Sequence, residues 1–205
     1  METIKDKTRK RILEAAQSLF MRYGYSRVVI DDIVRELAIS KKTIYNHFSG
    51  KSAILMACIE QFAEAYQVKA AAILQNDDLP IREKLTAYLE FIGLSFSSLS
   101  QDFWIDIKRS EPEAWAYINT FKQDISLKDF GQLMDEGVKA GYLLDDSSRH
   151  IGILMLIATM QQLTDPDYLS QFPAEITAAV PLDTSKRVEQ IVTILLRGLL
   201  AVTDS

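Results

Sequence analysis

The chain is poor in the residues that build disulfide frameworks, metal sites and irregular loops. Its 205 residues include one cysteine, two histidines, five prolines and eight glycines. A single cysteine, Cys58, excludes an intrachain disulfide and fits a reducing compartment, so we expect a cytoplasmic protein. Neither a metal-ligand spacing nor a glycine-rich phosphate loop is present. We therefore expect a protein that is not an enzyme and that has no cofactor and no metal.

Long apolar runs and an excess of basic charge are also missing. The most apolar segment, Ile151–Met160, is far shorter than the ~20 residues that span a bilayer, so we expect no membrane role. The net charge of −5 at first argues against a nucleic-acid partner. However, residues 1–51 carry 11 Lys and Arg against 6 Asp and Glu, whereas residues 52–205 carry 12 against 22. A basic N-terminal segment on an acidic body is typical of a DNA-binding protein.

What the chain does contain is helical periodicity, and no alternating strand pattern interrupts it. The sequence therefore predicts an all-α fold. Gly24 and Gly141 are expected to end helices, and Pro112 is expected in a first turn. The predicted helices cover approximately Thr8–Tyr23, a short segment ending at Leu37, Lys41–Phe48, Lys51–Gln75, Ile81–Ser98, Gln101–Arg109, Pro112–Ala140, Ser148–Thr164, Phe172–Val180 and Thr184–Thr203.

The segment Ile30–Lys51 has the pattern of two short helices joined by a tight turn. Ser40 is a plausible N-cap for the second helix, which would bury Ile44 and Phe48 at a spacing of four residues. Its remaining positions carry hydrogen-bond donors, as in the recognition helix of a helix-turn-helix. Periodicity alone fits equally well a helical protein whose lysines are merely solvated.

The residue string itself favours DNA binding. The run Ser40-Lys41-Lys42-Thr43-Ile44-Tyr45-Asn46-His47-Phe48, followed by Lys51, resembles the signature of the tetracycline-repressor (TetR) family of transcription regulators. Upstream, Ala15-Ala16, Leu19-Phe20, Gly24-Tyr25 and Asp32-Ile33 match the same signature in order and spacing. Two positions depart from it, since Val29 replaces a capping threonine and Ala38 replaces the turn glycine.

This resemblance implies a domain organisation and a function. It implies a three-helix helix-turn-helix DNA-binding domain in residues 1–51 and a helical effector-binding and dimerisation domain in residues 52–205. The expected function is a ligand-responsive regulator, a repressor that binds a palindromic operator in double-stranded DNA and is released by a small molecule. The alternative is an all-helical interaction or ligand-binding protein without specific DNA binding.

Carried over by position, the family's DNA contacts define a set of candidate residues. Lys41 or Lys42 suits guanine acceptors and Asn46 suits adenine. Tyr45 resembles the family's phosphate-binding tyrosine, whereas His47 is either a phosphate donor or a histidine near the core. The predicted DNA-binding residues are Ser40, Lys41, Lys42, Thr43, Tyr45, Asn46, His47 and Lys51.

Dimerisation and effector binding are expected from the C-terminal part. The last two long helices contain Ile151–Met160 and Ile191–Leu200, whose apolar character favours a homodimer interface, or else a central position within one subunit. Body aromatics form the predicted effector site, although each one also fits an ordinary core. They are Phe62, Tyr66, Phe91, Phe103, Trp104, Trp115 and Phe121. Because the body has no basic cluster, an apolar or cationic effector is favoured.

Two further residue types have open or ordinary interpretations. Cys58 is either a small buried apolar side chain or a redox-sensing thiol. The carboxylates of Asp106 and Glu111 are expected on a solvated face.

Overall fold

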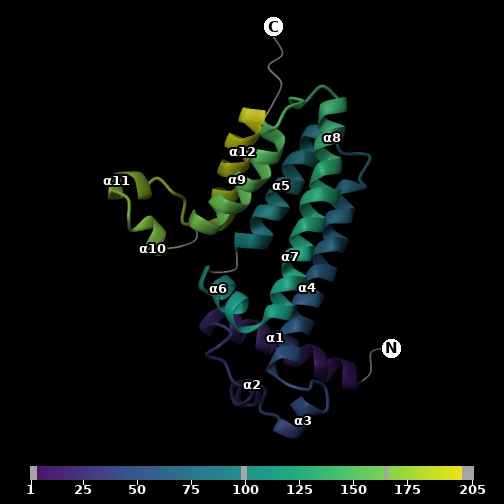
Figure 1. Ribbon diagram of the computed structural model, residues 1–205, viewed down its shortest axis with the longest axis vertical. Coiled ribbons are helices and arrows are strands. Elements are labelled where there is room, and N and C mark those ends of the chain that lie inside the picture. The colour runs from purple at the N-terminus through teal and green to yellow at the C-terminus, as the bar shows by residue number, and fades with distance from the viewer. Residues whose placement is uncertain (1–3, 98–100, 164–165, 200–205) are drawn as a thin grey trace. The chain divides into compact units, whose positions relative to one another are not determined.

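The computed structural model describes residues 4–97, 101–163 and 166–199, and within these ranges every regular element is helical (Figure 1). This confirms the all-α prediction. None of the described helices has the length and apolar character needed to cross a membrane. The elements are α1 (Ile4–Tyr23), α2 (Ile30–Leu37), α3 (Lys41–Tyr45), α4 (Lys51–Leu74), α5 (Ile81–Ser97), α6 (Gln101–Ser110), α7 (Pro112–Asp124), the π-helix η1 (Ile125–Phe130), α8 (Gly131–Lys139), α9 (Ser148–Leu163), α10 (Pro166–Leu169), α11 (Ala174–Thr177) and α12 (Thr184–Leu199).

The chain divides into two compact units. The first contains residues 1–65 and 101–121, and the second contains residues 66–100 and 122–205. The chain therefore passes into the second unit within α4, returns to the first at residue 101, where α6 begins, and leaves it again within α7. The first unit thus includes α6 and the start of α7 together with the N-terminal helices.

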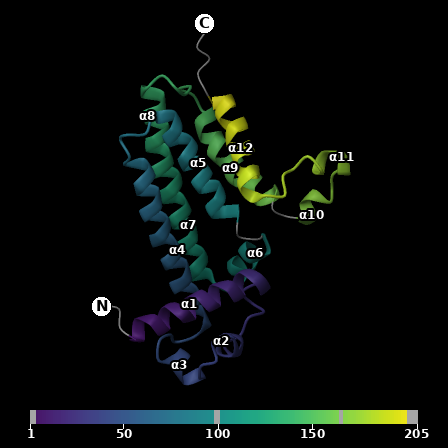
Figure 2. The ribbon, with the colours of Figure 1, turned by 180° about the vertical axis from the view of Figure 1, so that it is seen from behind.

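In the first unit, α2 and α3 lie on the same side of α1, as two opposite views show (Figures 1 and 2). The helices α1, α2 and α3 converge on a core to which Ile12, Phe20, Ile33 and Ile44 contribute fully buried side chains. The rings of Phe20 and Tyr25 lie 5.3 Å apart, so the chain segment after α1 is part of the same core.

Two helices end at the glycines where the sequence predicts their ends. Gly24 ends α1 with φ +84°, and its N–H donates to the carbonyl of Phe20 at 3.0 Å. Gly141, with φ +71°, follows the C-cap residue of α8, and its N–H donates to the carbonyl of Val138 at 2.9 Å. Glycine pays no Cβ penalty in this left-handed region, which explains both stops. The predicted helix ends at Ser98, Thr164 and Thr203 lie outside the described residues.

The predicted regular helix Pro112–Ala140 is wrong in its middle, because η1 is a π-helix. Ile125, Phe130 and Met134 are all buried, and the first two are five residues apart. An α-helix would direct the residue four after Ile125, which is Asp129, towards the buried side. The wider π turn brings Phe130 there instead.

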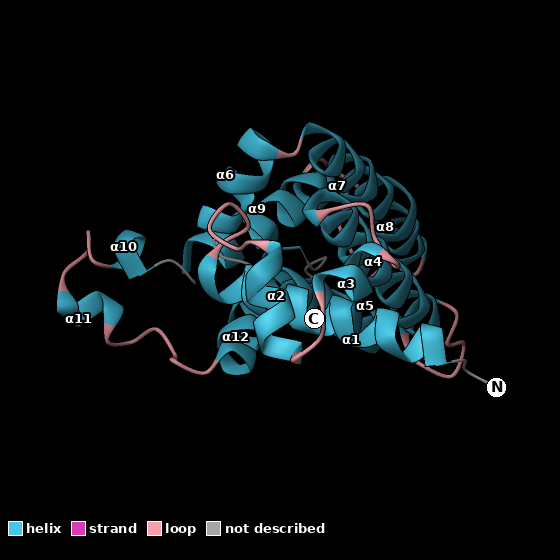
Figure 3. Ribbon diagram, turned by 90° about the horizontal axis from the view of Figure 1, so that it is seen from below, coloured by secondary structure: helices cyan, strands magenta, loops and turns pink. Residues whose placement is uncertain are grey.

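In the second unit, α5 packs against α9 and α12, and these two helices also pack against each other. Buried residues of α5 and α12 include Leu89, Ile92 and Val192. A Cβ placed on Gly93 would lie 2.8 Å from Cγ1 of Val188, so glycine permits this close approach of α5 and α12. The short helix α10 contacts α9, whereas α11 stands off from the rest of this unit, which is also visible from below (Figure 3).

Candidate nucleic-acid interface

Ser40 caps α3 as the sequence predicts. Its backbone is extended (φ −84°, ψ 153°), and its Oγ accepts a hydrogen bond from the Thr43 N–H at 3.1 Å. The hydroxyls of Ser40 and Thr43 also lie 2.9 Å apart. Both hydroxyls therefore help to build the start of the recognition helix, whatever they contact outside it.

The faces of the recognition segment divide sharply by polarity. Ile44 is fully buried and Phe48 is 7 % exposed, whereas the Tyr45 side chain is 53 % exposed. Lys41, Lys42 and Asn46 are exposed as well, and Thr43 and His47 are half-buried. The residues with donors thus face solvent around two apolar anchors. This surface has the composition that a DNA backbone and its base edges require.

Lys41 is paired with a carboxylate of the preceding helix. Its Nζ lies 2.7 Å from Oδ1 of Asp31 on α2, and the hydrogen bond and charge of Asp31 raise the pKa of Lys41. Both side chains are largely exposed, so the pair is weak and screened. To contact DNA, the Lys41 ammonium would leave the Asp31 carboxylate and bind a phosphate or a base instead.

Lys51 has a structural role that the sequence did not reveal. Its ammonium donates to the carbonyls of Tyr25 at 3.0 Å and Val28 at 2.9 Å, and it lies 4.1 Å from the centroid of the Tyr25 ring. Burial lowers the pKa of Lys51. Because two of the three ammonium donors are used on carbonyls, Lys51 ties the loop after α1 to the start of α4. Its phosphate contact stays a prediction.

Two carboxylates expected on a solvated face instead hold this loop, so that prediction is wrong for Asp106 and Glu111. Asp106 on α6 accepts hydrogen bonds from the Ser26 N–H at 2.6 Å and from the Ser26 hydroxyl. Glu111 accepts from the hydroxyls of Tyr25 and Ser52. The partners are 59 to 86 residues apart in sequence, so no local spacing could have revealed them.

The loop contacts shift two ionisation equilibria. Burial, followed by the hydrogen bond to Glu111, raises the pKa of Tyr25 to about 12, so its hydroxyl remains a donor at neutral pH. Burial alone would raise the pKa of Asp106, but the hydrogen bonds from Ser26 outweigh it and lower that pKa. Both shifts favour the donor and acceptor states that these hydrogen bonds need.

The two departures from the family signature have visible consequences. Val29 precedes α2 without a side-chain acceptor, and the Asp32 carboxylate accepts the Val29 N–H at 2.9 Å. This is one half of a capping box. Ala38 adopts the left-handed conformation (φ 52°, ψ 41°), the only non-glycine residue with positive φ among those described. The turn geometry expected for glycine is therefore kept, at a cost in strain.

The aromatic residues predicted for the effector site form separate pairs. In the first unit, the rings of Phe62 and Phe121 lie 6.4 Å apart, and those of Phe103 and Trp104 lie 5.8 Å apart. In the same unit, the centroid of the Trp115 ring lies 5.8 Å from Nζ of Lys108.

In the second unit, the rings of Tyr66 and Phe91 lie 4.6 Å apart. Beside them is a polar cluster that sequence reasoning missed, consisting of Tyr66, the fully buried Tyr88 and Asp129 of η1. Burial raises the pKa of all three groups, and the Tyr88 hydroxyl interacts with both neighbours. This unit thus has a half-buried carboxyl group beside buried aromatic rings.

Cys58 has the environment of a structural thiol. Its Sγ donates to the Leu13 carbonyl at 3.6 Å, and burial raises its pKa to about 12. Because the thiolate is the reactive form, this environment disfavours redox chemistry at Cys58. Within the described ranges, no group of three or more His, Cys, Asp or Glu residues is arranged to hold a metal ion.

Comparison with known proteins agrees with this geometry. Residues 12–58 match the family described as bacterial regulatory proteins, tetR family. The chain is 26 % identical over 194 residues to the uncharacterized HTH-type transcriptional regulator YvaF of Bacillus subtilis (strain 168), covering 94 % of this chain and 95 % of YvaF. It is 39 % identical over 64 residues to the HTH-type transcriptional regulator UidR of Escherichia coli (strain K12), covering 31 % and 33 % of the two chains.

The fold is also that of known regulators. A putative transcriptional regulator from Saccharomonospora viridis, solved in complex with choline, superimposes with a TM-score of 0.73 at 19 % identity over 95 % of this chain and 98 % of that one. An N-terminal helix-turn-helix with an exposed donor-rich recognition helix, followed by a helical body, defines a DNA-binding transcriptional regulator. Residues 12–58 carry the N-terminal domain of the TetR family, and the similarity to YvaF over 94 % of the chain supports a TetR-family transcriptional regulator. Members of this family bind DNA and small-molecule effectors and are typically dimers.

Proposed function

We propose that this regulator is a repressor that binds a palindromic operator as a homodimer, with α3 of each protomer in the major groove. The observation that carries the proposal is the division of faces on α3, where Ile44 is buried and Tyr45 is 53 % exposed. A helix fixed by an apolar anchor and covered by donors is suited to a groove of matching acceptors. In this proposal, residues 1–51 bind DNA and residues 52–205 bind the effector and form the dimer. Because its DNA target lies in the cytoplasm, the proposed location of the protein is the cytoplasm as well.

The proposed contacts divide into base readers and phosphate binders. Lys42 and Asn46 read bases, because a lysine suits the O6 and N7 acceptors of guanine and an amide suits adenine. Tyr45 and His47 donate to phosphates, and Lys41 joins either group once it leaves Asp31. The Thr43 methyl suits a thymine methyl, while its hydroxyl and that of Ser40 stay in the helix cap. Lys51 contributes its third donor to a phosphate.

The proposed dimer interface contains the outer faces of α9 and α12. On α9, Ile151, Leu154 and Met155 are 53–67 % exposed in the single chain, next to the buried Ile153 and Leu156. An apolar patch of this kind is a common mark of a protein interface. On α12, Ile194 is 71 % exposed among polar neighbours. The larger apolar share of the interface therefore comes from α9.

The proposed effector is an apolar or cationic small molecule that binds in the body and releases the operator. Support for a cation comes from the polar cluster, because Asp129 supplies a carboxylate near the aromatic rings of Tyr66 and Tyr88. Rings and a carboxylate together attract an organic cation. An effector that prefers the conformation with lower operator affinity would shift the population away from DNA.

The experiment that tests the DNA contacts measures affinity for a DNA fragment selected from random sequence, at several salt concentrations. Replacing Lys41 and Lys42 together by alanine should lower the affinity, through the base contact of Lys42, and reduce the slope of log K against log salt by up to about 2 units, because Lys41 can bind one phosphate in each of the two protomers and each phosphate contact contributes about −0.9. Lys69→Ala, an exposed lysine of α4, is the matched control and should leave both quantities unchanged. A double variant that binds like the control would refute the proposed interface. A parent chain that never binds DNA would favour the alternative of a helical interaction protein.

A further inference from the structure

Residues 166–183, which contain α10 and α11, form an arm between α9 and α12. Helix α10 contacts α9, but in all three views α11 stands off from α5, α9 and α12 of its own unit (Figures 1, 2 and 3). The rings of Tyr168 and Phe172 pack within it, with centroids 5.2 Å apart. The arm therefore has internal structure, although it is not part of the main core.

A single guanidinium fixes the base of the arm. Arg187 of α12 donates from Nη1 to the carbonyl of Leu163 at 2.7 Å, at the end of α9. It also donates from Nε and Nη2 to the carbonyl of Pro181, at 3.0 and 2.9 Å. Because these carbonyls lie on the two sides of the arm, Arg187 sets where the arm leaves the body and where it returns.

The surface of the arm is apolar and acidic. Phe172, Ile176 and Leu182 are 42 %, 60 % and 96 % exposed. The only ionisable groups of residues 166–183 with a charge at neutral pH are the carboxylates Asp167, Glu175 and Asp183. Three exposed large apolar side chains on one short segment are a candidate contact surface for another protein.

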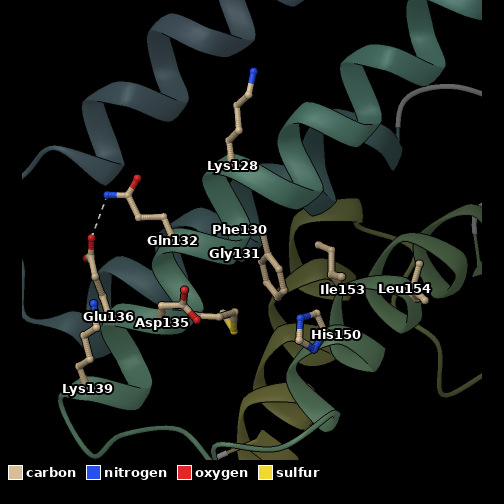
Figure 4. A pocket seen from close by; sticks show the side chains of 11 residues that line it. Lys128, Phe130, Gly131, Gln132, Asp135, Glu136, Lys139, His150, Ile153 and Leu154 are labelled. Atoms are coloured by element: carbon tan, nitrogen blue, oxygen red, sulfur yellow. Dashed lines mark hydrogen bonds between the residues drawn. The ribbon is translucent and has the colours of Figure 1, made fainter.

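A groove of about 810 Å³ between α8 and α9 has an apolar lining that matches the apolar side chains of the arm (Figure 4). Phe130, Met134 and Ile153 give it a buried apolar lining, and Leu154 lines it while being 67 % exposed. Lys128 and Lys139 line it as well, together with two carboxylates, Asp135 and Glu136. Glu136 accepts a hydrogen bond from Gln132, and Lys128 is paired with Asp124 at 2.9 Å. The groove thus offers apolar contact, and its two lysines are balanced by two carboxylates.

We propose that the arm of one protomer packs into the α8–α9 groove of a second copy of this chain. The inference rests on the homodimer of the proposed function and adds a second contact to it. A second copy is the occupant because the arm is inserted between α9 and α12, the two helices that carry the proposed dimer surface. Leu154 belongs both to that surface and to the groove, so the two are continuous. Two-fold symmetry forms the contact twice.

The test is cross-linking between two differently tagged copies that are expressed together, one carrying Ile176→Cys and the other Gln132→Cys. A short bifunctional maleimide should join the two tags, because the arm and the groove meet between protomers. The matched control replaces the arm cysteine by Val68→Cys on α4, where the parent side chain is 72 % exposed, and should give no mixed product. Cys58 stays in every chain, and the parent chain reports its background reaction.

A second measurement gives the contribution of the arm. Ile176→Ser should raise the dimer dissociation constant at least tenfold in sedimentation equilibrium, whereas Val68→Ser should change it less than twofold. A parent chain that is monomeric at all concentrations would overturn the dimer and the arm together. A parent chain that dimerises, without a mixed cross-link and with Ile176→Ser equal to Val68→Ser, would overturn the arm contact alone.

Discussion

Replacing Asp106 by asparagine tests how the loop after α1 is held. Asp106 accepts two hydrogen bonds from Ser26, and its side chain is only 15 % exposed. Asparagine keeps the shape but presents one acceptor and one donor group, so one of the two Ser26 donors would face an N–H. A hydrogen bond to a charged group contributes ~1.5–3 kcal/mol. Because Ser26 is exposed and water can replace a partner, we expect a loss of about 1–2 kcal/mol in the free energy of unfolding.

Tryptophan fluorescence suits this measurement. The only two tryptophans of the chain, Trp104 and Trp115, belong to the same unit as Asp106 and Ser26. Urea unfolding followed by their emission therefore reports the affected unit. Glu113→Gln, which removes an exposed carboxylate of α7, is the matched control and should change the free energy by less than about 0.5 kcal/mol.

The pH dependence of the stability difference between the parent chain and Asp106→Asn is an independent test. Because the folded-state pKa of Asp106 is lowered, its contribution is complete above the ordinary carboxyl pKa and is lost as pH falls through the lowered value. The stability difference between the parent chain and Asp106→Asn should therefore be constant near neutral pH and shrink below about pH 4. Equal stability of Asp106→Asn and Glu113→Gln at pH 7, or a difference that grows in acid, would refute the reasoning.

Three further predictions have defined outcomes. Ala38→Gly should raise the free energy of unfolding by about 0.5 kcal/mol, since relief of ~1 kcal/mol of left-handed strain exceeds the added flexibility of the unfolded chain; a lower urea midpoint would contradict this. Gly93→Ala should lower the free energy of unfolding by about 1–3 kcal/mol, because its Cβ would meet Val188 at 2.8 Å. Gly198→Ala, which has open space around its Cβ, should raise it by up to about 1 kcal/mol, and thermal melts of both variants measure the difference. Cys58 should react with iodoacetamide at pH 8 far more slowly than free cysteine, as followed by mass spectrometry, and equal rates would show that the thiol is not shielded.

The recognition segment was predictable because its signals are local. The Ser40 cap, the spacing of Ile44 and Phe48 and the donors between them all lie within nine consecutive residues. The helix is shorter than expected, since α3 ends at Tyr45 rather than Phe48, and the donors still face solvent. Which of these donors touch DNA remains a prediction that the proposed variants test.

Longer-range roles were not predictable in the same way. Lys51 matches a family position, yet its ammonium is used on the carbonyls of Tyr25 and Val28. Asp106 and Glu111 have no local pattern that separates them from solvated carboxylates, because their partners come from distant segments. A short helical periodicity also cannot show that a π turn brings Phe130 to the buried side of the helix.

The amino-acid sequence by itself determined the helical class, most helix ends and the polarity of the recognition helix, because caps, glycine stops and apolar spacing act over a few residues. Tertiary structure alone decided which carboxylates hold the loop after α1, how Lys51 is used and which apolar side chains of α9 and the arm remain exposed. These outcomes depend on contacts between residues that are far apart along the chain, where burial and hydrogen-bond partners arise only when the helices pack.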